Sequence, residues 1–196
     1  TDLYLINTKF PLIYNMRTES IRNQKQQIIG SFVTLTDVTR NRLFVERLRE
    51  IAGVDALTGL KNRYGYQEAL REIDNEENLP ISVIFGDVNG LKKINDTQGH
   101  DCGDRMLRDI ASVIRTVCGD QGCAARIGGD EFAVLLPGCP ASAALDVIGE
   151  IHTEITRLPD HGYPVSIALG CATKQHVDEN LNKLISEADQ KMYKSK

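Results

Sequence analysis

The chain has 196 residues, of which 41% are hydrophobic and 26% are charged. This balance is ordinary for a globular protein with a buried core. The 27 acidic and 23 basic residues give a formal net charge of −4, which argues against a nucleic-acid-binding protein.

The apolar runs and the cysteines indicate the cellular compartment of the chain and whether it contacts a membrane. No apolar run approaches the length of a membrane span, and no signal peptide opens the sequence. The five cysteines are odd in number and form no Cys-x-x-Cys pair, which favours reduced thiols. We therefore expect a cytoplasmic protein in which this segment makes no membrane contact. A longer parent protein that is attached to a membrane is compatible with these features.

The first 39 residues differ from the rest. Residues 10–14 and 28–35 are strand-like, and a polar segment over 22–27 joins them, which predicts a β-hairpin. The end of the second strand, Thr34 to Thr39, resembles the last strand of a PAS sensor domain. We therefore interpret 1–39 as a partial PAS-like β segment. The alternative is an N-terminal hairpin with no sensory role.

Residues 40–54 predict a short amphipathic helix. Phe44, Leu48 and Ile51 recur at intervals of four and three residues, with arginine and glutamate between them. Two to three turns are too few to establish a coiled coil. The helix is either a signalling linker that pairs with its twin in a second chain, or a helix that packs on its own domain.

The remaining segment alternates predicted strands and helices. Residues 81–85, 123–127 and 132–136 are apolar runs of strand length, and the last two predict an antiparallel hairpin. Apolar residues at helical spacing predict further helices, and we interpret these residues as core: Tyr66, Ala69, Leu70 and Ile73; Leu107, Ile110, Ala111 and Ile114; Leu145, Ile148, His152 and Ile155; Leu181, Leu184, Ile185, Ala188 and Met192.

Carboxylates stand at two of the predicted strand ends. Asp130 and Glu131 follow a diglycine turn in which Gly128 and Gly129 can adopt positive φ, and Asp87 stands where the 81–85 strand stops. By itself such a turn is most often a solvated hairpin tip. An EF-hand over 87–98 is excluded, because lysine and glutamine stand where its glycine and glutamate belong.

Four motifs, at 55–63, 87–104, 128–132 and 187–196, resemble those of the GGDEF-domain diguanylate cyclases. That family condenses two GTP molecules into cyclic di-GMP and releases two pyrophosphates. The resemblance implies an α+β domain over 55–196, similar to the palm of nucleotidyl cyclases and polymerases. We therefore expect a mostly antiparallel central sheet flanked by helices, preceded by the β-hairpin and the linker helix.

The resemblance also implies a two-metal phosphoryl-transfer site that uses two Mg²⁺ ions, with Mn²⁺ as an expected substitute. Asp87, Asp130 and the carbonyl of Val88 correspond to the metal ligands. Glu131 corresponds to a further catalytic carboxylate, which either assists metal binding or deprotonates the attacking hydroxyl. Lys92 would neutralise the triphosphate, as a catalytic residue. The phosphate-binding residues implied are Gly90, Leu91, Lys92, Lys93 and Lys196.

The resemblance implies that Asn95 and Asp104 recognise guanine. A carboxylate that accepts from N1 and N2 of the base would be left unpaired by adenine, and this discriminates between the two purines. The alternatives are that Asn95 is a turn residue and that Asp104 is a helix N-cap. Arg126 is either a charge at the sheet edge or a neighbour of phosphate.

The resemblance implies GTP as substrate and a homodimer as the catalytic unit, because each site holds one GTP and the product joins two. Asn89 stands at the place of a frequent second aspartate. Gly119 and Gly122 stand where an inhibitory product site would place arginine and aspartate, so we expect no such site. The alternative function is a non-catalytic GTP-binding or dimerisation module for signalling.

Overall fold

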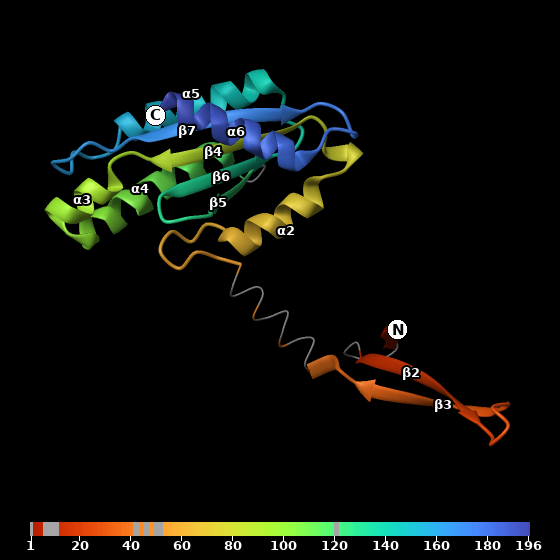
Figure 1. The fold of residues 1–196 in the computed structure, drawn as a ribbon. Coiled ribbons are helices and arrows are strands. Elements are labelled where there is room, and N and C mark those ends of the chain that lie inside the picture. Colours follow the sequence, from red (N-terminus) through yellow and green to blue (C-terminus); the bar gives the residue numbers. More distant parts are fainter. Residues whose placement is uncertain (1, 6–11, 41–43, 45–47, 49–52, 120–121) are drawn as a thin grey trace. The chain divides into compact units, whose positions relative to one another are not determined.

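The computed structural model describes residues 2–5, 12–40, 44, 48, 53–119 and 122–196. The chain divides into two compact units, residues 1–51 and 52–196 (Figure 1). Among the described residues, no helix is both long and apolar enough to cross a membrane.

The N-terminal unit is a three-stranded antiparallel sheet in the order β1-β2-β3, formed by Asp2–Leu5, Leu12–Arg22 and Ile28–Asp37. The predicted hairpin is confirmed, and β1 adds a strand that the sequence pattern did not show. Asn23 closes the turn, because its side-chain oxygen accepts from the backbone N–H groups of Lys25 at 2.9 Å and Gln27 at 3.0 Å. The PAS-like interpretation stays a prediction.

The predicted linker helix falls mainly on residues outside the described part of the chain. Of its apolar stripe, Phe44 and Leu48 are described, both as helical, and their exposed fractions are 64% and 48%. Ile51 lies outside the described residues.

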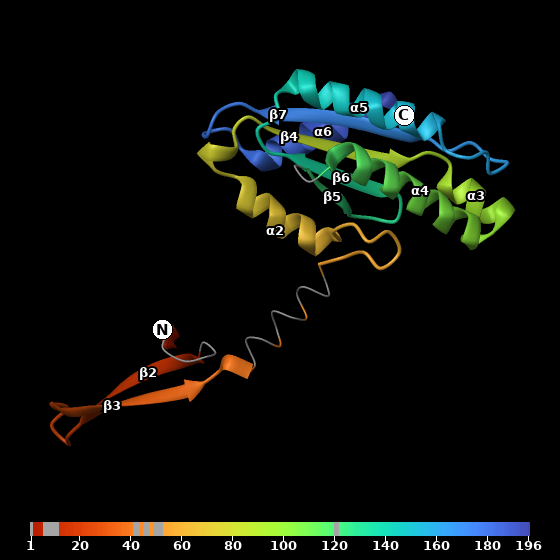
Figure 2. The ribbon, with the colours of Figure 1, turned by 180° about the vertical axis from the view of Figure 1, so that it is seen from behind.

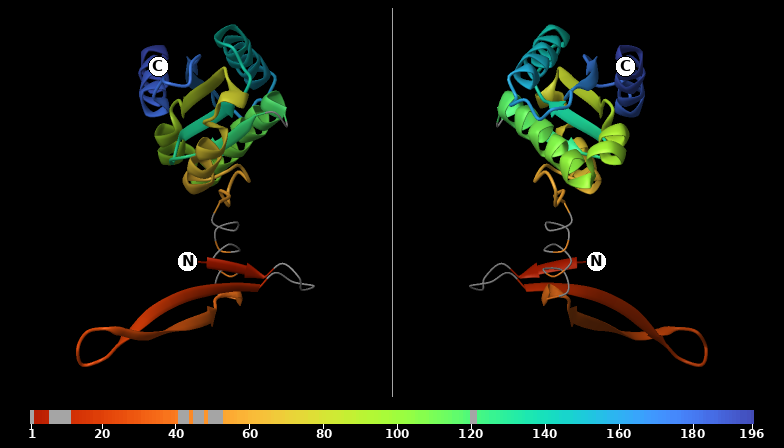
Figure 3. Two further views of the ribbon diagram at one scale, coloured as in Figure 1. Left: turned by 90° about the vertical axis from the view of Figure 1, so that its right-hand side faces the viewer. Right: turned by 90° about the vertical axis from the view of Figure 1, so that its left-hand side faces the viewer.

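The C-terminal unit has the expected α+β architecture, a four-stranded antiparallel sheet in the order β5-β6-β4-β7 with helices on both faces (Figures 1 and 3). Its strands are β4 (Ile81–Val88), β5 (Cys123–Arg126), β6 (Glu131–Leu136) and β7 (Ile167–Lys174). Its helices are α2 (Arg63–Ile73), α3 (Leu91–Gln98), α4 (His100–Cys118), α5 (Ala141–Thr156) and α6 (Leu181–Ser195), with a 3₁₀ turn, η1, over Glu76–Asn78.

Each face of the sheet has its own core. Val83, Ala133 and Ala172 belong to the cluster beneath α2 and α6, whereas Ile84 and Val134 belong to the cluster beneath α3, α4 and α5 (Figures 2 and 3). Successive residues of a strand point to opposite faces, so a sheet covered on both sides needs apolar residues at nearly every position. The central strand β4 accordingly is mostly apolar, with Ser82 as a buried polar exception and Asp87 near its end.

Both edges of this sheet are covered. On the β5 side, the Lys61 N–H donates to Ala124 O at 3.1 Å and the Arg126 N–H donates to Lys61 O at 2.8 Å, which forms a parallel bridge. On the β7 side, three side chains meet outward-facing carbonyl groups: His152 Nε2 lies 3.1 Å from Ile167 O, Ser195 Oγ donates to Leu169 O at 3.1 Å, and Lys191 Nζ donates to Cys171 O at 2.9 Å. These contacts satisfy backbone groups that an edge strand would otherwise present.

The predicted apolar stripe of α5 is wrong at two positions. Leu145 is 60% exposed and His152 is exposed, whereas Ala144, Ile151 and Ile155 face the core. The true stripe lies one residue earlier over part of the helix. His152 is therefore at the rim, where its ring reaches the edge of β7.

Candidate active site

Three acidic residues lie together where β4 ends and β6 begins. Asp87 of β4 lies directly opposite Glu131 of β6, so the two side chains share one face of the sheet. The Val88 N–H donates to the carbonyl of Asp130 at 2.9 Å, which holds the turn residue beside the end of β4. Residues far apart in the sequence are thereby fixed as neighbours by backbone pairing.

The diglycine turn holds Glu131 close to its own backbone. The N–H groups of Ile127 and Gly128 donate to Glu131 O at 2.9 and 3.4 Å. A Cβ atom on Gly128 would lie 2.2 Å from Glu131 Oε2, whereas one on Gly129 would meet nothing within 4 Å. Neither glycine has positive φ, so the expected conformational reason is wrong. Gly128 is required by the carboxylate that lies over it.

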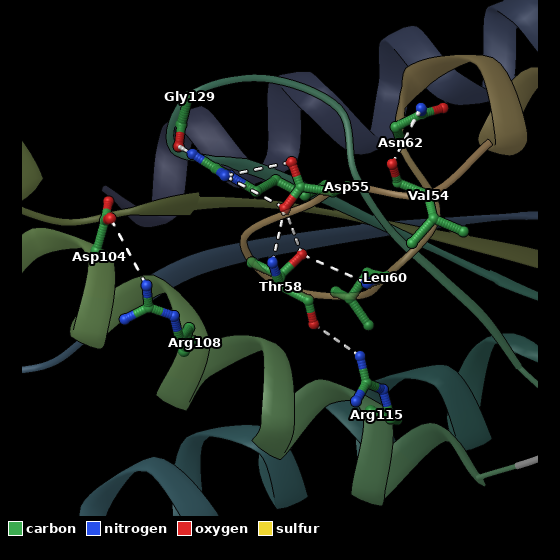
Figure 4. Close-up of polar contacts among 10 residues, drawn as sticks. Val54, Asp55, Thr58, Leu60, Asn62, Asp104, Arg108, Arg115 and Gly129 are labelled. Carbon is green, nitrogen blue, oxygen red and sulfur yellow. Dashed lines mark hydrogen bonds and ion pairs between the residues drawn. The ribbon is translucent and has the colours of Figure 1, made fainter. Parts of the chain in front are cut away.

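Arg126 braces this turn from beneath. Its Nε and Nη2 atoms donate to Gly129 O at 3.1 and 2.7 Å, and its Nη1 atom lies 3.3 Å from both carboxylate oxygens of Asp55 (Figure 4). The two side chains are only 14% and 22% exposed. Arg126 is thus a charge on the edge strand β5, one of the two expected alternatives, and it ties the turn to the entrance of the domain. A role beside phosphate stays a prediction.

Asp55 is held as a carboxylate. Thr58 donates to Asp55 Oδ1 from its backbone N–H at 2.9 Å and from its hydroxyl at 2.7 Å. Partial burial alone would raise the pKa of Asp55, but the hydrogen bonds from Thr58 and the charge of Arg126 together lower the pKa below its ordinary value of 3.8.

Arg63 also contacts the turn, although the sequence pattern did not identify it as a site residue. Its Nε donates to Ile127 O at 2.9 Å, and its Nη2 lies 3.7 Å from Glu131 Oε2. Asn62 caps α2 by accepting from the Gly65 N–H at 3.0 Å, which fixes the first turn that carries Arg63. The sequence feature that could have identified Arg63 is its position directly after the capping asparagine, Asn62. Arg63 and Glu131 border a groove of about 420 Å³ between α2 and α6.

Lys196 lies against a carboxylate rather than in open solvent. Its Nζ donates to Asp87 Oδ1 at 2.7 Å, with side chains 41% and 15% exposed. The hydrogen bond to Asp87 and the nearby charge of Asp130 raise the pKa of Lys196. The predicted phosphate ligand is therefore at the carboxylate end of the site.

The predicted phosphate-binding residues form the loop and first turn after β4. Gly90 is the N-cap of α3 with φ 73° and no side-chain cap, so the N–H groups of the first turn are not capped by a side chain. Leu91 is buried, whereas Lys92 and Lys93 are exposed. Uncapped N–H groups beside exposed lysines suit a phosphate chain.

The predicted guanine-binding residues lie on the helix pair α3 and α4. Asn95 is inside α3, so its expected alternative as a turn residue is wrong. Asp104 is the fifth residue of α4, whose N-cap is Gly99, so the N-cap alternative is also wrong. A Cβ on Gly103 would lie 2.0 Å from Asn95 Oδ1, which places Asn95 against the turn that carries Asp104. Asp104 Oδ2 lies 3.7 Å from Arg108 at the surface (Figure 4).

The donor set at the carboxylate end fits magnesium chemistry. Mg²⁺ takes oxygen ligands, commonly one or two carboxylates plus phosphate oxygens and water. Asp87 and Asp130 supply carboxylates, and their charges already attract the Lys196 ammonium. Among the described residues there is no group of three or more His, Cys, Asp or Glu side chains placed to hold a metal.

The family model described as "Diguanylate cyclase, GGDEF domain" matches residues 52–196. The chain belongs to the GGDEF domain family. The diglycine turn with Asp130 and Glu131, the opposed Asp87 and the α3–α4 pair are thus features of a GGDEF domain.

The relatives that match this chain are named for two different activities. This chain is 32% identical over 186 residues to cyclic di-GMP phosphodiesterase PdeB of Shewanella oneidensis, which covers 93% of the chain and 22% of PdeB. It is 33% identical over 159 residues to diguanylate cyclase DgcS of the same organism, which covers 80% of the chain and 53% of DgcS. The chain therefore spans about half, or less, of the length of these relatives.

A solved structure shares the fold. The coiled coil and GGDEF domain of DgcB from Caulobacter crescentus, in complex with c-di-GMP, superposes with a TM-score of 0.71 at 30% identity and covers 81% of this chain and 87% of that one. Diguanylate cyclase SiaD from Pseudomonas aeruginosa, in complex with its activator SiaC, superposes with a TM-score of 0.67 at 27% identity and covers 80% of this chain and 63% of that one.

The lowered pKa of Asp55 predicts a pH-dependent contribution to stability. A carboxylate whose folded pKa is depressed stabilises the fold above its unfolded pKa, about 3.9, and loses that contribution as the pH falls through the folded value. Asp55→Asn should therefore lower the free energy of unfolding at pH 7 by more than it does at pH 3, as measured by urea denaturation. Asp178→Asn, which changes an exposed carboxylate, is the control. An equal effect of Asp55→Asn at both pH values contradicts the assignment.

Proposed function

We propose that this GGDEF domain condenses two GTP molecules into cyclic di-GMP. The observation that carries the proposal is that backbone pairing makes Asp87, Asp130 and Glu131 neighbours at one end of the sheet. The uncapped first turn of α3 follows directly after β4, and Asn95 and Asp104 lie on the helices beyond it. Carboxylates, a phosphate-binding turn and base-binding groups are the parts that a nucleotidyl transfer needs.

The reaction joins a ribose 3′-hydroxyl to an α-phosphorus, and pyrophosphate leaves. Two Mg²⁺ ions bound by Asp87, Asp130 and the Val88 carbonyl would supply the stabilisation of negative charge on the phosphoryl oxygens. Lys92 and the N–H groups that follow Gly90 bind the β- and γ-phosphates, which holds the α-phosphorus against the carboxylates.

Glu131 has two candidate roles, and its setting favours one of them. Its carboxylate lies over Gly128 and 3.7 Å from Arg63, whereas Asp87 is the carboxylate in contact with the Lys196 cation. The neighbouring Arg63 guanidinium orients this carboxylate toward the turn. We assign Glu131 to deprotonation of the attacking hydroxyl, as the general base.

Catalysis requires two copies of the chain. Each site binds one GTP, and the product contains two joined head to tail, so the 3′-hydroxyl in one site must reach the α-phosphorus in the other. Residues 40–54 are the proposed device that brings the copies together, through the apolar side chains of Phe44, Leu48 and Ile51.

The alternative is a GTP-binding or dimerisation module without catalysis. The naming of PdeB as a phosphodiesterase supports this alternative, because a segment similar to nearly all of this chain is present in a protein with another named activity. Retention of Asp87, Asp130 and Glu131 favours the cyclase, because a module that only binds GTP has no need of a complete carboxylate set.

Incubation with GTP and Mg²⁺ should yield cyclic di-GMP, detected by chromatography. Asp130→Asn should reduce the yield roughly a hundredfold or more, because it removes a metal-binding charge while it preserves side-chain volume. Asp146→Asn, at an exposed position of α5, should leave the yield unchanged. Absence of product from the parent chain, together with measurable GTP binding, would establish the non-catalytic alternative.

Base selectivity should depend on Asp104. Asp104→Ser replaces an acceptor-only carboxylate with a hydroxyl that both donates and accepts, so the preference for GTP over ATP should fall roughly tenfold or more. Competition binding with the two nucleotides measures this ratio. Asp101→Ser, in the exposed first turn of the same helix, is the matched control. An unchanged ratio in Asp104→Ser would remove Asp104 from base recognition.

Activity per chain should rise with protein concentration, because a short apolar stripe gives weak association. Leu48→Glu places like charges in the proposed seam, so it should lower activity several-fold at a given concentration while GTP binding per chain persists. Leu145→Glu, at another exposed leucine, is the control. Activity that is flat on dilution and equal in Leu48→Glu would mean that the copies meet through another surface.

A further inference from the structure

The position of Lys196 is fixed by the helix that precedes it. Ser195 Oγ contacts both Leu169 O at 3.1 Å and Met192 O at 2.8 Å, which attaches the last turn of α6 to β7. Helix α6 lies directly on this strand, because a Cβ on Gly170 would be 2.1 Å from Met192 N. Lys196 therefore reaches Asp87 from an anchored helix end.

Two of the three carboxylates at this end of the sheet have a cation beside them. Asp87 is 15% exposed, lies opposite Glu131 in the ladder and has Asp130 beside it, so carboxylates are concentrated at the start of the site. Partly buried carboxylates that lack a counter-charge repel one another and lose solvation. Arg63 lies near Glu131, and Lys196 is the cation in contact with Asp87 among the ion pairs of the described residues.

A divalent cation and an ammonium group cannot both occupy the same face of one carboxylate. Lys196 Nζ is 2.7 Å from Asp87 Oδ1, the distance of a charge-assisted hydrogen bond, and so occupies one of the two carboxylate oxygens that a metal could bind. A triphosphate brings several negative oxygens to the same region. The triphosphate therefore offers the Lys196 ammonium a new partner, and a metal can then bind Asp87.

We propose that Lys196 is an exchangeable counter-ion of Asp87, which occupies the cation site of the nucleotide-free chain and transfers to phosphate when a nucleoside triphosphate binds. This inference rests on the proposed function for the identity of the nucleotide. Metal affinity is then low without nucleotide and rises when nucleotide draws the lysine away. By linkage, the metal raises nucleotide affinity by the same factor.

Free Mn²⁺ can be measured by electron paramagnetic resonance during titration of the chain without nucleotide. Lys196→Gln should bind Mn²⁺ roughly tenfold more tightly than the parent, because it removes the competing charge. Lys196→Arg, which keeps the charge, and Lys194→Gln, an exposed lysine in the last turn of the same helix, should bind as the parent does. With GTP present, the order should reverse, so that the parent binds Mn²⁺ more tightly than Lys196→Gln.

The double variant Lys196→Gln with Asp87→Asn locates the effect, since it should lose the gain in Mn²⁺ affinity. Equal Mn²⁺ affinity in the parent and Lys196→Gln without nucleotide would overturn the inference, as would a gain that persists in the double variant. These outcomes are separable from those of the product assay. A chain that makes no cyclic di-GMP but shows the tenfold gain keeps the counter-ion role and loses the cyclase, and an active chain without the gain does the reverse.

Discussion

The register between β4 and β6 is the constraint on which the site depends. It places Asp87 opposite Glu131 and brings the Asp130 carbonyl to the Val88 N–H. A slip of one residue would turn Asp87 toward the face covered by α3, α4 and α5, and would turn the apolar residues of each core toward the opposite face. Because both faces of β4 are buried, the two cores resist such a slip. The same apolar packing that stabilises the domain therefore fixes the separation of its carboxylates.

Local sequence patterns predicted three of the four strands of this domain, but not β7, and they did so for a physical reason. The strands 81–85, 123–127 and 132–136 and the stripe of α6 are set by periodicity, which short windows of sequence contain. The α5 stripe failed because Ala144 carries little hydrophobic weight in a pattern, whereas Leu145 carries much although it is exposed. The family resemblance predicted roles for the site residues, but it did not predict the contacts that these residues make.

Contacts between distant residues could not be predicted. Arg126 and Asp55 are 71 residues apart, Arg63 and Ile127 are 64 apart, and Lys196 and Asp87 are 109 apart. Nothing local distinguishes a bracing arginine from a solvated one, because the partner is defined by the folded sheet. The reason for two of the glycines could not be predicted from the sequence either. Gly128 and Gly103 are needed for space beside Glu131 and Asn95, and neither has the positive φ by which a glycine is usually explained.

The covered edges of the sheet bear on how the protein can assemble. Lys61 bridges the outer side of β5, while His152, Lys191 and Ser195 contact the outward carbonyl groups of β7. A second sheet could extend this one only by displacing those groups, and each displaced group would need a new partner. Strand addition is therefore disfavoured at both ends, which protects the domain from runaway edge-to-edge polymerisation. Contacts between copies of this domain would then fall on its helices and loops, where they can form and separate while the sheet that carries the carboxylates stays intact.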